Sequence, residues 1–75
     1  MNENDIMKKI AFNIKVERMR KGLTQFQLAE MINVHEKYIG KIESGKQNIT
    51  IKTLIKLANS LGTDLKKFID IKDDE

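Results

Sequence analysis

The 75-residue sequence contains no cysteine, no proline and no tryptophan, and its one histidine is His35. The absence of cysteine excludes disulfides, thiol nucleophiles and cysteine–zinc sites, and a single histidine cannot form a conventional histidine cluster for a metal. No apolar run approaches the roughly 18 residues of a membrane span. The start of the chain is acidic and polar, where a signal peptide would be basic and then apolar. We therefore expect a cytoplasmic protein of one small domain, with no metal and no cofactor.

The sequence also contains few residues that could carry out catalysis together. Hydrolysis needs a positioned base together with a nucleophile or a metal. The nearest candidates are His35, Glu43 and Ser44, and one short helix would place them on different sides. We do not expect an enzyme.

The net charge of +3 hides an asymmetry along the chain. Residues 70–75 hold four of the 11 acidic residues, and without this segment the chain has 13 basic and 7 acidic residues, a formal charge of +6. A basic body of this size attracts nucleic acid by displacing condensed counterions. Many proteins with similar charge have no such role, so charge alone assigns no function.

Apolar residues recur at helical spacing in five segments that are separated by residues suited to capping or ending a helix. The predicted helices cover about residues 6–22, 24–33, 35–44, 50–62 and 64–70. No strand-like alternation, internal repeat or low-complexity linker occurs, so we expect an all-α, compact five-helix bundle. The domain is predicted to span residues 6–71, between a disordered N-terminus at residues 1–5 and an acidic C-terminal tail at residues 72–75.

Several predicted helix ends depend on single residues. Asn4 or Asp5 is expected to cap the first helix, and threonines are expected to cap the second, fourth and fifth helices: Thr24, Thr50 and Thr63. Asn33 tolerates the left-handed conformation that a sharp stop requires. The fourth helix has a broad apolar face that includes Ile51 and Ile55.

The third predicted helix has two unlike sides. Winding it at about 100° per residue places His35, Ile39 and Ile42 on one side. Lys37, Gly40, Lys41 and Ser44 fall on the opposite side, with Glu36 beside them. A helix that is buried along its rear and polar in front suits the major groove of DNA, which admits one helix. We interpret it as a recognition helix.

The run LTQFQLAEMINVHEKYIGKIESGK resembles the helix-turn-helix of the phage-repressor type, also called Cro/C1 or Xre, and the similarity extends over about residues 12–68. The resemblance implies a lambda-repressor-like fold. Within that family, the Tyr38-Ile39-Gly40 run and the segment from Asn48 to Leu54 look similar to the controller proteins of restriction–modification systems. Asn33 replaces the usual glycine of the turn, and Gln47 stands where a basic residue is frequent, so a target sequence does not carry over.

The resemblance implies ten DNA-binding positions: Gln25, Glu36, Lys37, Tyr38, Gly40, Lys41, Ser44, Lys46, Gln47 and Asn48. Gln25 matches a position that contacts phosphate or an adjacent base. Lys37 can donate to guanine and Glu36 can accept from cytosine, although both can also be solvated surface charges. Tyr38 serves packing or a DNA contact, and Gly40 reflects a close approach either of DNA or of another helix.

Three further sets of residues have expected roles in the fold or in assembly. Arg18 and Glu43 are expected to form a partly desolvated ion pair that fixes the recognition helix on the first helix. His35 is expected to be structural. Phe68, Ile69 and Ile71 are our candidates for a dimer interface, with Phe68 able to serve the core instead.

The leading hypothesis is a sequence-specific transcriptional regulator that binds a pseudo-palindromic DNA operator as a homodimer. RNA polymerase is then a further candidate partner, and no membrane partner is expected. The alternative is a protein-interaction module of the antitoxin or anti-repressor type on the same fold. The sequence leaves open the operator, its half-site spacing and whether binding represses or activates.

Overall fold

The computed structural model describes residues 2–71, so the predicted acidic tail at residues 72–75 lies outside the described residues. The helices are α1 (Glu3–Arg20), α2 (Gln25–Ile32), α3 (Glu36–Glu43), α4 (Ile51–Leu61) and α5 (Lys66–Ile69). No strand occurs in residues 2–71. The prediction of an all-α fold with five helices is confirmed.

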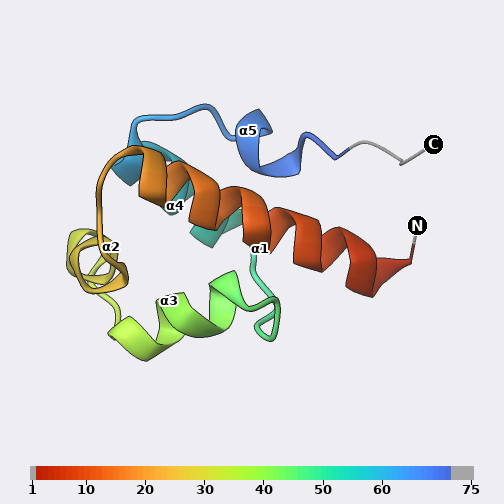
Figure 1. Ribbon diagram of the computed structural model, residues 1–75, viewed down its shortest axis with the longest axis horizontal. Coiled ribbons are helices and arrows are strands. Elements are labelled where there is room, and N and C mark those ends of the chain that lie inside the picture. Colours follow the sequence, from red (N-terminus) through yellow and green to blue (C-terminus); the bar gives the residue numbers. More distant parts are fainter. Residues whose placement is uncertain (1, 72–75) are drawn as a thin grey trace.

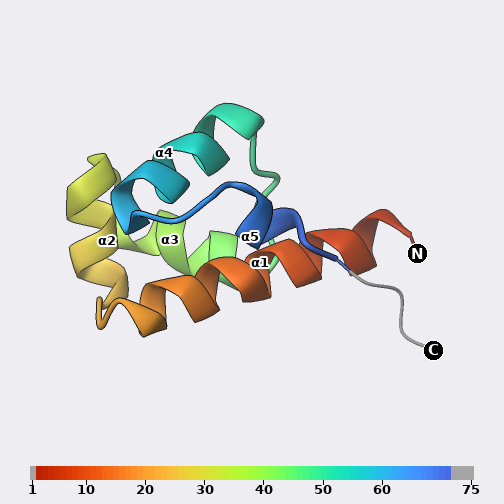
Figure 2. The ribbon, with the colours of Figure 1, turned by 90° about the horizontal axis from the view of Figure 1, so that it is seen from above.

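The long helix α1 runs along most of the molecule, and the other helices pack around it (Figure 1). In this view α3 lies below α1, α5 lies above it and α4 lies behind it. Seen from above, α2 crosses the end of the molecule where α1 stops (Figure 2). Because α2 contacts both α3 and α4, it holds the recognition helix against the rest of the bundle. No helix in residues 2–71 is long and apolar enough to cross a membrane.

The start of α1 differs from the prediction. The cap is Asn2 rather than Asn4 or Asp5, and its side chain accepts a hydrogen bond from the Asp5 backbone N–H at 2.9 Å. The helix therefore begins at Glu3, and the prediction that residues 1–5 are disordered is wrong for residues 3–5. The acidic side chains of this first turn stabilise the helix, because they lie near the positive end of the helix dipole.

The fifth helix is shorter than predicted. It covers only Lys66–Ile69, and its first residue has no side-chain cap. The Thr63 hydroxyl, which we expected to cap it, instead donates to Glu17 of α1 at 3.5 Å. The Asn13 amide donates to the Phe68 carbonyl at 2.9 Å, so side chains of α1 hold this end of the chain.

One apolar core joins all five helices. Its fully enclosed side chains are Ile14, Leu28, Ile39, Leu57 and Phe68. Phe68 is completely covered within one chain, so its expected place in a dimer interface is wrong and its role is core packing. Ile51 and Ile55 are exposed, which corrects their expected place on the buried face of α4.

Candidate nucleic-acid interface

Helix α2 begins and ends at the residues that the sequence predicts. The Thr24 hydroxyl accepts from the Gln27 N–H at 3.0 Å, and the Gln27 side chain accepts from the Thr24 N–H at 2.9 Å. This reciprocal pair is a capping box. At the other end Asn33 adopts the left-handed conformation, with φ 59° and ψ 51°. The chain can therefore turn sharply into α3.

His35 caps α3. Its Nδ1 accepts a hydrogen bond from the Lys37 N–H at 3.1 Å, which satisfies one of the free donors at the start of the helix. The structural role predicted for His35 is confirmed. Its expected place on the buried side of the helix is wrong, because the cap position lies outside the helical winding and the side chain is exposed.

The two sides of α3 have the expected difference in burial. Ile39 and Ile42 are buried, and the outward side chains are exposed: Glu36, Lys37, Lys41 and Ser44. Tyr38 is half-buried and packs against the core. The Ser44 hydroxyl donates to the Lys41 carbonyl at 3.0 Å, so it closes the end of the helix.

The loop after α3 continues this exposed surface. Lys46 and Asn48 are exposed, while Gln47 is half-buried. Gly45 has a left-handed φ of 77°, and a Cβ added there would lie 3.3 Å from the Lys8 Cγ. Both the conformation and the tight contact with α1 favour glycine. This turn sets where the loop leaves the recognition helix.

The predicted ion pair between Arg18 and Glu43 is present. The Arg18 Nε donates to Glu43 Oε2 at 2.7 Å and its Nη2 donates to Oε1 at 3.1 Å, a bidentate arrangement. The Arg18 Nη1 also donates to the Leu23 carbonyl at 2.6 Å. The side chains of Arg18 and Glu43 are 10% and 3% exposed. The pair therefore fixes the end of α3 on α1 in a largely water-excluded place.

Gln25 joins this pair, which the sequence did not predict. Its Nε2 donates to Glu43 Oε1 at 3.1 Å. A Cβ added at Gly40 would lie 3.6 Å from the Gln25 Oε1, which is an ordinary contact distance. Packing of α2 on α3 thus leaves room for a methyl group, and close approach of another helix does not explain Gly40.

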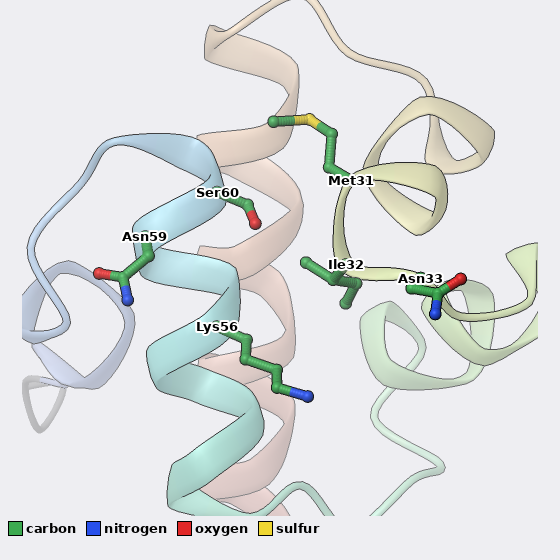
Figure 3. A pocket seen from close by; sticks show the side chains of 6 residues that line it. All are labelled: Met31, Ile32, Asn33, Lys56, Asn59 and Ser60. Atoms are coloured by element: carbon green, nitrogen blue, oxygen red, sulfur yellow. The ribbon is translucent and has the colours of Figure 1, made fainter.

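A separate groove lies between α2 and α4 (Figure 3). Its volume is about 330 Å³. The lining residues are Met31, Ile32, Asn33, Lys56, Asn59 and Ser60. The amine end of Lys56 extends across the groove toward α2 (Figure 3). None of the predicted site residues lines it.

Residues 14–68 match the model of the helix-turn-helix family HTH_3, and the chain belongs to this family. It is a non-enzymatic, DNA-binding regulator with a lambda-repressor-like fold. The sequence is 40% identical over 65 residues to control protein C.SmaI of Serratia marcescens, and this alignment covers 87% of this chain and 77% of that protein. It is 37% identical over 73 residues to control protein C.MunI of a Mycoplasma species, covering 92% and 96%.

Solved structures of restriction–modification controller proteins share the fold. C.Esp1396I superposes with a TM-score of 0.78 at 35% identity, over 87% of this chain and 86% of that one. C.AhdI of Aeromonas hydrophila gives a TM-score of 0.79 at 27% identity, over 83% and 94%. The resemblance to this group that the sequence suggested is confirmed.

Proposed function

We propose that this protein is a sequence-specific operator-binding regulator that reads DNA through the outward side of α3. One observation carries the proposal: Ile39 and Ile42 bury the rear of α3, and its front presents exposed Glu36, Lys37 and Lys41. A helix fixed in this way matches the width of the major groove. The lysines supply donors for guanine or phosphate, and Glu36 supplies an acceptor for cytosine.

We also propose that the operator is a pseudo-palindrome bound by a homodimer. One helix reads only a few base pairs, so useful specificity needs two half-sites about 34 Å apart. The apolar surface left outside the core favours such pairing. Ile69 of α5 is 46% exposed and Ile51 of α4 is 62% exposed, and Ile71 is half-buried.

The similarity to control proteins of restriction–modification systems supports a controller role of the same kind. Such a regulator would act on its own promoter and on the endonuclease gene, and RNA polymerase would be its partner there. A neighbouring pair of methyltransferase and endonuclease genes would support this assignment. Their absence would leave a regulator of other genes.

The proposal is tested by selection from a random duplex library of about 30 base pairs at about 150 mM salt, which spans two half-sites and suppresses non-specific phosphate binding. We expect an inverted repeat. A protein-interaction module of the antitoxin or anti-repressor type would enrich no sequence, and that result would refute operator binding.

Substitutions then identify which side chains contact the base edges. Lys37→Gln should lose affinity for the selected operator and relax the preference at one base pair, by about 1–3 kcal/mol. The control is Lys52→Gln, because Lys52 is an exposed lysine on α4 and the charge change is the same. Equal losses in the two variants would refute base reading by Lys37.

A further inference from the structure

Three helices meet at one carboxylate behind the recognition helix. Glu43 of α3 accepts hydrogen bonds from Arg18 of α1 and from Gln25, the first residue of α2. Gln25 and Arg18 share the oxygen Oε1, each at 3.1 Å. The Gln25 amide is therefore attached to the same group that fixes the end of α3.

The chemistry of the carboxylate sets the orientation of this amide. An ionised carboxylate only accepts hydrogen bonds, so the nitrogen of Gln25, not its oxygen, must face Glu43. An amide nitrogen carries two hydrogens, and one of them is donated to Glu43. Among residues 2–71 the second hydrogen has no hydrogen-bond acceptor, and Gln25 is half-buried at the start of α2. This second N–H of Gln25 is therefore available to an acceptor from outside the described part of the chain.

We propose that Gln25 is a positioning residue that couples a DNA backbone phosphate to the orientation of α3. The second N–H binds a phosphate oxygen while the first stays on Glu43, so the phosphate, α2 and α3 become one rigid unit. The inference rests on the proposed operator binding, and the family resemblance already implies a contact from Gln25 to a phosphate or an adjacent base. The geometry adds the coupling through Glu43.

This coupling predicts a role in sequence discrimination. A plain phosphate contact adds the same free energy to every DNA sequence, because all sequences share the backbone. A contact that also fixes α3 holds its front side chains against the base edges. Without it α3 can adjust to mismatched sequences, and the advantage of the operator over other DNA shrinks.

The test compares Gln25→Met with the control Lys46→Met. Methionine keeps the length of glutamine and removes both hydrogen bonds. Lys46 is a predicted DNA-binding residue, and among residues 2–71 the side chains that donate to Glu43 are those of Arg18 and Gln25. Affinity is measured for the selected operator and for a scrambled duplex at several salt concentrations. Both variants should bind more weakly. The salt slope should fall by about 1 for Lys46→Met, which removes a charge, and should stay unchanged for Gln25→Met, because glutamine is neutral.

The ratio of operator affinity to scrambled-duplex affinity separates the two roles. Gln25→Met should lower this ratio about fivefold or more, and Lys46→Met should leave it within about twofold of wild type. Melting curves check that both variants are folded. Gln25→Lys should restore the ratio, because an ammonium has three donors and can serve Glu43 and a phosphate together.

Two results would overturn the inference. The first is a ratio in Gln25→Met that falls no further than in Lys46→Met, and the second is a Gln25→Lys ratio no better than that of Gln25→Met. In both cases wild type still prefers its operator, so the proposed function stands. A wild-type protein with no preferred sequence would refute both together.

Discussion

At the residue scale, the guanidinium of Arg18 is held by three hydrogen bonds among the described residues. It donates to both oxygens of Glu43 and to the Leu23 carbonyl, and it is the buried charged residue of the core. Removing one partner of a buried pair leaves the other charge without compensation. Arg18→Ala should therefore lower the free energy of unfolding by about 3 kcal/mol, measured by urea denaturation.

Arg20 offers a matched control on the same helix. Its Nε lies 3.9 Å from Glu17 and its side chain is 69% exposed. Exposed pairs of this kind contribute little, so Arg20→Ala should change stability by less than about 0.5 kcal/mol. Similar urea midpoints for the two variants would show that the Arg18 pair does not stabilise the fold.

Two glycines make opposite predictions because their surroundings differ. Gly40 lies inside α3 with space for a Cβ, and Gly45 has a φ of 77° beside Lys8. Gly40→Ala should raise the free energy of unfolding by about 0.5–1 kcal/mol, because alanine favours the helix. Gly45→Ala should lower it by about 1 kcal/mol or more, because alanine disfavours the left-handed region.

Urea denaturation of both glycine variants checks this contrast, and destabilisation by Gly40→Ala would contradict it. The same Gly40→Ala protein also addresses the second explanation for this glycine. If DNA approaches the backbone closely there, the more stable variant should bind the selected operator more weakly.

At the element scale, the turn between α2 and α3 depends on one left-handed residue, Asn33. Asparagine tolerates this conformation better than alanine, and glycine adopts it freely. Asn33→Ala should lower the free energy of unfolding by about 1–2 kcal/mol. Asn33→Gly should leave it unchanged or slightly higher, and equal losses in both variants would show that the side chain itself matters.

Helix ends were predictable where the deciding interaction is local. Thr24, Asn33 and Thr50 act within a few residues of their own positions, and their predicted roles are confirmed. The missed ends have other causes. Asn2 competes with two neighbours of similar capping ability, and Thr63 bonds to Glu17, which is 46 residues away.

The candidate site shows the same division. The exposed front of α3 follows from helical winding, because only one helix is involved. The Arg18–Glu43 pair could be anticipated from the sides on which the two residues lie. The link from Gln25 to Glu43 could not, because it depends on how α2 crosses α3. Winding also could not decide whether Phe68 faced the core or a second chain.

At the scale of the whole molecule, the apolar residues that the fold leaves uncovered bear on assembly. In the described part of the chain, α4 exposes Ile51 and Ile55, and α5 exposes Ile69. Phe12 is also exposed, but it lies on α1 and not on α4 or α5. A homodimer would remove some of this surface from water and place two recognition helices one turn of DNA apart.

Ile69→Asp should shift the protein from dimer to monomer in sedimentation at tens of micromolar, because a charge buried in an interface without a partner is strongly unfavourable. Phe12→Asp, the matched control, should leave the dimer intact. Ile69→Asp should still melt cooperatively, since the side chain lies outside the core. Its monomer should retain weak binding to a single half-site and lose preference for the inverted repeat, since each half-site is then bound alone. A wild-type protein that stays monomeric at these concentrations would refute the dimer, and α3 would then have to select its target through one half-site.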